Sequence, residues 1–191
     1  MSLIFIVLNI QIIISEYQNI TIKMYEGLNQ SIINENYTKF IQEIYINDEL
    51  QTNIISTYNL SEEYNTIKLI FNSTLIDCSN MFKNCFNIYE IDFKDFNTSE
   101  IEFMYGLFYN CNSLKSIDLS DFYIPKVKAM ANLFYNCSSL ISLDLSSFDT
   151  SKVTRMNHMF FNCKSLNISC ILVIEENLIL DKFIDVNEEH P

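Results

Sequence analysis

A unit of 26 residues recurs along the second half of the chain. The stretch LFYNCNSLKSIDLSDF, at 107–122, returns almost unchanged as LFYNCSSLISLDLSSF at 133–148. Less regular copies begin at residues 81 and 159. Self-similarity at a period of this length is typical of solenoids, in which each unit buries one face against the next. The repeat therefore predicts a solenoid over residues 67–166, which we call the array.

Two hydrophobic periodicities lie inside each unit. In SLISLDLSSF, Ile141, Leu143 and Leu145 occupy alternate positions, a period of two that is typical of a strand. In SKVTRMNHMFFNC, apolar residues recur three and four positions apart, which is the spacing of a short amphipathic helix. The predicted fold class is therefore α/β, a solenoid in which each rung consists of a strand, a turn and a helix.

The composition changes along the chain and divides it into four parts. Residues 1–15 contain the apolar run LIFIVLNIQIII, which is too short to span a bilayer but matches the core of a secretory signal peptide. The alternative is a buried first strand. Residues 16–66 alternate like strands, and we expect them to form a β-rich cap over the open end of the array. Beyond the array at 67–166, residues 167–191 are a C-terminal cap or a truncated end. No later segment suits a membrane anchor, so no membrane span is expected in the mature chain.

The repeat has a sequence that can be compared with known families. The stretch SSLISLDLSSFDTSKVTRMNHMFFNCKSL, at 138–166, resembles the repeat of BspA-like leucine-rich-repeat surface proteins. The resemblance extends over about residues 67–166. It implies a leucine-rich-repeat solenoid in a secreted or surface-exposed protein, with a role in adhesion and protein binding.

Charge and motifs exclude several classes of function. The formal net charge is −12, and no basic patch is visible, which argues against nucleic acid as a partner. The sequence shows no Ser-His-Asp set and no catalytic Cys-His arrangement, and two glycines cannot build a nucleotide-binding loop. We therefore expect neither an enzyme nor a bound cofactor.

Four cysteines share one column of the repeat at a spacing of 26 residues: Cys85, Cys111, Cys137 and Cys163. Zinc sites usually need two close pairs of ligands, and single cysteines so far apart with only two histidines do not supply them. Stacked rungs would bring successive cysteines within disulfide range, but inward thiols in one column more often act as small buried hydrophobes. We expect a structural ladder of free thiols, with Cys163 and Cys170 as the pair most suited to a disulfide.

An asparagine precedes each of these cysteines, as in Asn110-Cys111. Asparagine tolerates the left-handed backbone conformation that ends many helices. We therefore expect Asn110 and its equivalents to end the predicted helix of each rung and to turn the following cysteine toward the core.

Acidic residues form a second column, which points outward from the predicted strands. Stacked carboxylates at these positions could bind a cation or a basic partner, or they could be solvated or accept hydrogen bonds from neighbouring serines. Other outward positions vary from copy to copy, as expected of a binding face on a common scaffold. The candidate binding face comprises Asp92, Asp118, Asp144, Tyr89, Glu90, Lys94, Lys115 and Asp121.

These observations predict a secreted or cell-surface leucine-rich-repeat protein with a non-catalytic role. Its strand face would bind a protein or glycan ligand on another surface, because a rigid repeat scaffold offers variable side chains at fixed positions. Two alternatives remain at this stage. The chain could be a structural component whose exposed rungs stack on neighbouring chains, or a cytoplasmic interaction scaffold if the N-terminal run is not a signal peptide.

Overall fold

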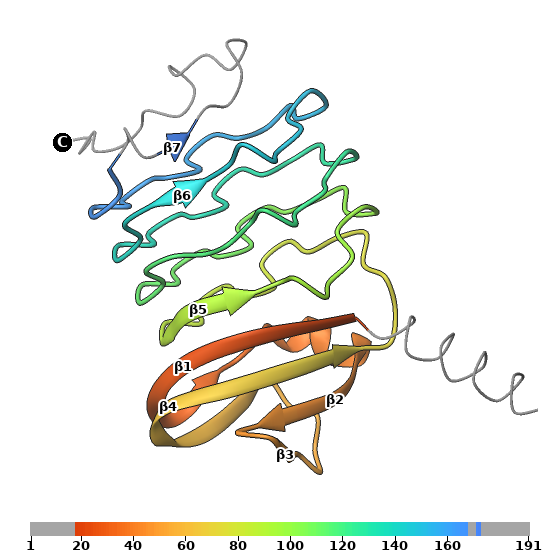
Figure 1. Ribbon diagram of the computed structural model, residues 1–191, viewed down its shortest axis with the longest axis vertical. Helices are drawn as coiled ribbons and strands as arrows, with labels where there is room; N and C mark the ends of the chain where they lie inside the picture. Colours follow the sequence, from red (N-terminus) through yellow and green to blue (C-terminus); the bar gives the residue numbers. More distant parts are fainter. Residues whose placement is uncertain (1–17, 168–170, 173–191) are drawn as a thin grey trace, which may run out of the picture.

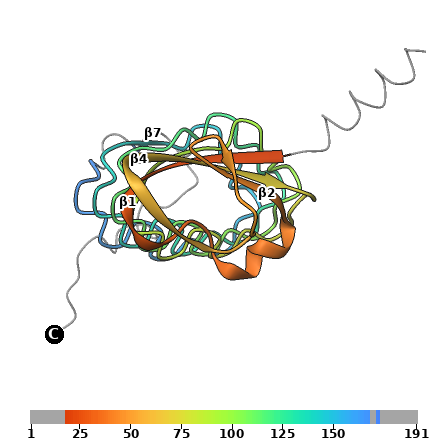
Figure 2. The same ribbon diagram turned by 90° about the horizontal axis from the view of Figure 1, so that it is seen from below.

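The computed structural model describes residues 18–167 and 171–172. The predicted signal peptide at 1–15 and Cys170 lie outside these residues. The N-terminal strands are packed at one end of a stack of coils formed by the repeats (Figure 1). Seen from below, the coils share one oblong outline (Figure 2).

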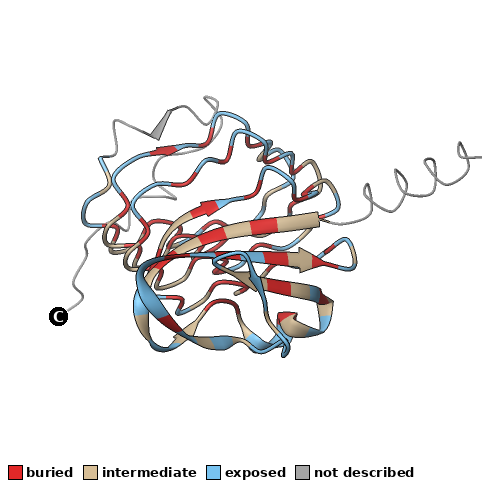
Figure 3. Ribbon diagram, turned by 60° about the horizontal axis from the view of Figure 1, so that its bottom comes forward, coloured by how far each residue is buried: buried red, intermediate tan, exposed pale blue. Residues whose placement is uncertain are grey.

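The N-terminal segment and the first repeat form one antiparallel sheet of five strands, in the order β3-β2-β4-β1-β5. Along β1, Ile20, Ile22 and Met24 are buried while the residues between them are not, as the alternating pattern predicts (Figure 3). Since β1 pairs with β4 on one side and with β5 on the other, the sheet continues from the N-terminal segment, residues 16–66, into the array, residues 67–166. Its strands are β1 (Gln18–Ser31), β2 (Ile41–Ile46), β3 (Glu49–Leu50), β4 (Thr57–Phe71) and β5 (Ile88–Asp92).

The other repeats stack beyond β5 and enclose a core of aromatic and aliphatic side chains. A second, two-stranded parallel sheet pairs β6 (Leu143–Asp144) with β7 (Ile171–Leu172). Phe82, Phe108 and Phe134 are fully buried and stack with nearly parallel rings, with centroids 6.0 and 5.2 Å apart. Equivalent side chains thus meet across the stack, and each repeat buries the apolar face of its neighbour.

The predicted α/β fold with a helix in every rung is wrong. The main sheet is antiparallel, and the described residues contain one short 3₁₀ helix, η1 (Glu35–Phe40), and no α-helix. The apolar residues that suggested an amphipathic helix lie instead in consecutive turns. These turns do bury their apolar side chains, so spacing alone did not distinguish them from a helix.

Left-handed residues explain why no helix forms. Each repeat has two positions with positive φ, four residues apart. The prediction that Asn110 adopts this conformation is confirmed, with φ 62°, but it ends a turn rather than a helix. The other position was missed. Its column contains Asn80, Gly106, Asn132 and His158. A left-handed residue every fourth position interrupts the continuous right-handed backbone that a helix requires.

The backbone hydrogen bonds show what replaces the helix. The N–H groups of Asn80, Phe82 and Asn84 donate to carbonyls 25 residues later, in the next repeat, at 2.8–2.9 Å. The N–H groups between them, as in Lys83 to Asn80, donate three residues back within the same turn. Neither set is the four-residue bond of an α-helix, because alternate amides bond between repeats. The same arrangement recurs in the next two repeats.

Asparagine side chains form a ladder along the same edge. Asn110 donates through Nδ2 to Asn84 Oδ1 at 2.9 Å, and Asn136 donates to Asn110 Oδ1 at 2.8 Å. Asn162 continues the series by donating to Asn136. Stacked asparagine amides of this kind are a known stabiliser of repeated strands. Asn110, Asn136 and Asn162 thus each have two roles, a left-handed turn and a bond to the preceding repeat, and Asn84 accepts the first bond of the series.

The strand segment of each repeat also differs from the prediction. Ile141 was expected to point inward, but its side chain is 57% exposed. Leu140 and Leu143 are buried, and the two residues between them both face outward. Two adjacent outward residues, as in a β-bulge, shift the alternation of inward and outward side chains by one residue. Three repeats therefore each present two adjacent outward side chains, at residues 89–90, 115–116 and 141–142.

Replacing Asn136 separates its two roles. We expect Asn136→Gly to keep the left-handed turn but lose two side-chain hydrogen bonds, lowering the free energy of unfolding by about 1–3 kcal/mol. Asn136→Ala should lower it by about 1 kcal/mol more, because alanine is strained at positive φ. Urea unfolding followed by circular dichroism measures both. Equal stabilities for the alanine and glycine variants would contradict the conformational part of this account.

Candidate functional site

The column of aspartates points outward, as predicted, and each carboxylate ends its strand segment with a turn. Asp92 Oδ1 accepts a hydrogen bond from the Lys94 N–H at 2.8 Å. Asp118 and Asp144 accept equivalent bonds from the N–H groups of Ser120 and Ser146, at 2.9 and 2.8 Å. Aspartate stabilises such turns by binding the amide two residues on. The column thus has a structural role that needs no ligand.

The same bonds shift the acidity of the aspartates. The N–H of Ser120 lowers the pKa of Asp118, and that of Ser146 lowers the pKa of Asp144, because both amides favour the charged carboxylate. Repulsion from Asp118 opposes the second shift. Both side chains lie on the surface, so they remain charged at neutral pH.

The variable positions of the candidate binding face lie on the same outward side. Lys94, Lys115 and Asp121 are exposed, and Tyr89 and Glu90 are half-buried. Lys23 of β1 binds Glu90 of β5 at 2.7 Å. Glu90, Asp92, Lys94, Asp118 and Asp121 line a shallow hollow of about 300 Å³ between two repeats.

Tyr25 and Tyr64, which the sequence did not identify as candidates, lie on the same side of the molecule. Tyr64 of β4 is paired with Tyr25 of β1, and their ring centroids are 5.9 Å apart. Tyr89 of β5 lies 4.7 Å from Tyr25 and 6.0 Å from Tyr64. Lys115 Nζ lies 5.6 Å from the Tyr25 centroid, and hydrogen bonding to Tyr25 raises the pKa of Lys115. We call Tyr25, Tyr64, Tyr89 and Lys115 the tyrosine cluster.

The tyrosine cluster joins side chains from three strands and one further repeat. We call the outer face the surface formed by this cluster together with Glu90, Asp92, Asp118 and Asp144. Tyr64 is 59% exposed. Tyr25 directly follows the alternating stretch NITIKM and falls on its outward positions, so the pattern could have indicated that the Tyr25 side chain points outward. Its nearness to Tyr64 and Tyr89 could not be predicted, because it depends on the pairing of β1 with both β4 and β5.

The cysteine column faces inward. Cys85, Cys111, Cys137 and Cys163 are free and buried in this structure, and so is Cys78. Cys170, the predicted partner of Cys163, lies outside the described residues. Among the described residues, no group of three or more His, Cys, Asp or Glu side chains could hold a metal ion.

The thiols also make bonds that the sequence did not predict. Cys111 Sγ donates to Phe82 O at 3.2 Å, and Cys137 Sγ donates to Phe108 O at 3.1 Å. Burial raises the pKa of Cys85 and of Cys163 to about 12. A thiol that stays protonated is a poor nucleophile, so these cysteines serve packing and hydrogen bonding.

Comparison with known proteins places the repeats in a family. A family described as "Mycoplasma protein of unknown function, DUF285" matches residues 76–173, just over half of the chain. The chain belongs to this family. No curated protein and no solved structure matches it. The part shared with DUF285 contains the asparagine, cysteine and aspartate columns, whereas Tyr25 and Tyr64 precede it.

The strands that carry Tyr25 and Tyr64 thus lie outside the part of the chain that matches DUF285. No helix in the part of the chain that the structure describes has the length and hydrophobicity needed to cross a membrane.

The aspartate turns predict a loss of stability in acid. The pKa of Asp118, Asp144 and Asp149 is lower in the folded protein than in the unfolded chain. Their contribution to the free energy of unfolding is therefore complete above the unfolded pKa, and it is lost as the pH falls through the folded pKa. We expect the urea midpoint to fall between about pH 5 and pH 2. The triple variant Asp118→Asn, Asp144→Asn, Asp149→Asn should show a shallower fall, since asparagine retains the acceptor, as Asn97 does for Ser99. An unchanged slope would contradict this assignment.

The thiol ladder predicts slow labelling in the folded protein. We expect Cys111 and Cys137 to resist a thiol-specific disulfide reagent at neutral pH and to react once urea unfolds the chain, because both are fully buried. Mass spectrometry of the labelled peptides identifies the reacting residues. Rapid labelling of either cysteine under native conditions would show that the column is accessible.

Proposed function

We propose that the protein is a non-catalytic binding protein, secreted or held at a cell surface, which binds a protein or glycan on another surface through the outer face. The observation that carries this proposal is the tyrosine cluster. Monomeric proteins seldom leave several aromatic side chains together on an exposed sheet surface, and such patches commonly mark interaction sites.

The chemistry of the cluster suits binding. Tyrosine offers a large, stiff contact area together with a hydroxyl group, so it is common where one surface recognises another. Lys115 and the Lys23–Glu90 ion pair border the rings and add charged groups at the edge. An aromatic centre with a polar border is the usual composition of a binding patch.

The scaffold supports binding by holding these groups in place. Tyr25 and Tyr64 are fixed by the long pairing of β1 with β4, and Tyr89 by the pairing of β1 with β5. Side chains that are already positioned lose less conformational entropy on binding. The variable Lys115 and Ile141, which follow Tyr89 in one column, extend the same surface along the array.

Two further parts of the proposal rest on the sequence. Export to the cell surface is supported by the apolar run in residues 1–15 and by the resemblance to BspA-like surface proteins. A non-catalytic role is supported by the missing catalytic motifs and by the buried, protonated thiols.

Adhesion measurements test the outer face. Beads coated with the protein are passed over glass coated with mucin and over glass coated with serum proteins. We expect the wild-type protein to adhere to one of them, and Tyr25→Ala combined with Tyr64→Ala to reduce bead retention by roughly tenfold or more, because aromatic anchors dominate binding energy. The matched control is Tyr123→Ala, since Tyr123 is 65% exposed and lies outside the cluster. Equal retention of the double variant and wild type, or no adhesion to either coating, would contradict the proposal.

A further inference from the structure

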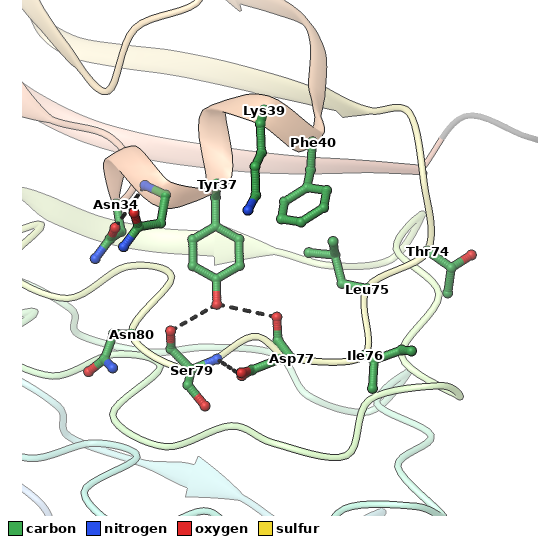
Figure 4. A pocket seen from close by; sticks show the side chains of 11 residues that line it. Asn34, Tyr37, Lys39, Phe40, Thr74, Leu75, Ile76, Asp77, Ser79 and Asn80 are labelled. Atoms are coloured by element: carbon green, nitrogen blue, oxygen red, sulfur yellow. Dashed lines mark hydrogen bonds between the residues drawn. The ribbon is translucent and has the colours of Figure 1, made fainter.

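A pocket of about 590 Å³ lies at a different place, between η1 and the segment that leads into the first repeat (Figure 4). Lys39 and Phe40 border it from η1, and Asp77 and Ser79 border it from the opposite side. Its volume is within the range of sites that hold small molecules. None of its lining residues belongs to the outer face.

The walls of the pocket are fixed by hydrogen bonds. The buried Tyr37 hydroxyl lies 2.8 Å from Ser79 O and 3.2 Å from Asp77 O, so it ties η1 to the opposite wall. Asn34 N–H donates to Met81 O at 2.7 Å at the start of η1. At its end, Asn72 N–H donates to Phe40 O at 2.9 Å. A pocket held at three points keeps its shape when empty, which favours binding.

Several polar groups along the pocket have capacity for further hydrogen bonds. Lys39 Nζ lies 4.9 Å from the Phe40 centroid and forms no ion pair with any described residue. Asp77 Oδ1 accepts a hydrogen bond from the Ser79 N–H at 2.7 Å, which leaves the second carboxylate oxygen to accept one from a ligand. Asn36 is exposed, and its amide can donate and accept. One cation and one anion balance each other, so the pocket attracts neither phosphates nor metal ions strongly.

Apolar side chains form part of the same lining. Phe40, Leu75 and Ile76 contribute to it, and Ile76 is 59% exposed. An uncharged ligand that suits this mixture carries many hydroxyl groups and also has a C–H face that can pack on apolar side chains. Sugars have this combination, and carboxylate, amide and ammonium groups all bond to hydroxyls.

We propose that this pocket binds a neutral saccharide of one or two rings, with Lys39, Asn36 and Asp77 bonding its hydroxyls and Ile76 and Phe40 packing on its C–H face. The site is separate from the outer face. Its success or failure is therefore independent of the proposed adhesion function.

Saturation-transfer NMR with the full chain tests the site, using the methyl glycosides of glucose, galactose, mannose and N-acetylglucosamine as probes. Bacterial expression without glycosylation keeps Asn36, which begins an Asn-Tyr-Thr triplet, unmodified. We expect at least one glycoside to bind, and Lys39→Met or Asp77→Asn to weaken it by about tenfold, the effect of one lost charged hydrogen bond.

Matched controls keep the result interpretable. Lys83→Met removes a lysine that also lies 4.9 Å above an aromatic ring, that of Tyr109, but that does not line the pocket. Asp149→Asn alters an aspartate that also accepts an amide hydrogen bond two residues on, from Ser151. Both controls should bind like wild type, and circular dichroism should show all four variants folded.

Three results would overturn the proposal. The first is that none of the four glycosides binds. The second is that a glycoside binds equally well to the Lys39 and Asp77 variants, or is lost equally in the controls. The third is that glycine, tested as a small zwitterion, binds instead with the same dependence on Lys39 and Asp77, which would assign the pocket to ligands carrying both charges.

Discussion

The hydrogen bonds between successive repeats are the constraint on which the rest of this structure depends. Alternate amides between Cys78 and Asn84 donate to the next repeat and not back along their own turn. This requires a left-handed residue at two positions of every repeat, four residues apart. It also requires a constant repeat length, because one inserted residue would displace every later donor from its acceptor. The 26-residue period and the recurrent asparagines are two consequences of this one requirement.

Fixed stacking turns each column of the sequence into a physical ladder. Asparagine amides bond to one another, thiols donate to phenylalanine carbonyls, and phenylalanine rings stack in the core. Charged columns follow the same rule at the surface, where Lys126 and Lys128 bind Glu100 and Glu102 of the preceding repeat, both at 2.6 Å. These exposed ion pairs add little stability individually. The ladders inside the stack are more important, because buried polar groups are costly unless they are hydrogen-bonded.

The N-terminal strands do more than cover one end of the array. By pairing with β5, β1 continues the sheet from the first repeat into the N-terminal segment, and it places Tyr25 and Tyr64 beside Tyr89. On another side, η1 docks on the loop before the first repeat and encloses the saccharide pocket that we propose. Both candidate sites therefore lie at the junction of the two parts, whereas the aspartate column within the repeats stabilises turns.

The sequence by itself determined the repeat, its inward columns, the left-handed asparagine before each cysteine and the outward direction of the aspartates, because these follow from period and local backbone preference. The column of Asn80, Gly106 and Asn132 carried the missing signal, since all three tolerate positive φ and a helix does not. Only the tertiary structure decided between helix and turns, because the competing acceptors belong to the next repeat. Only the structure brought the three tyrosines together and formed the pocket beside η1, because both depend on contacts between segments far apart in the chain.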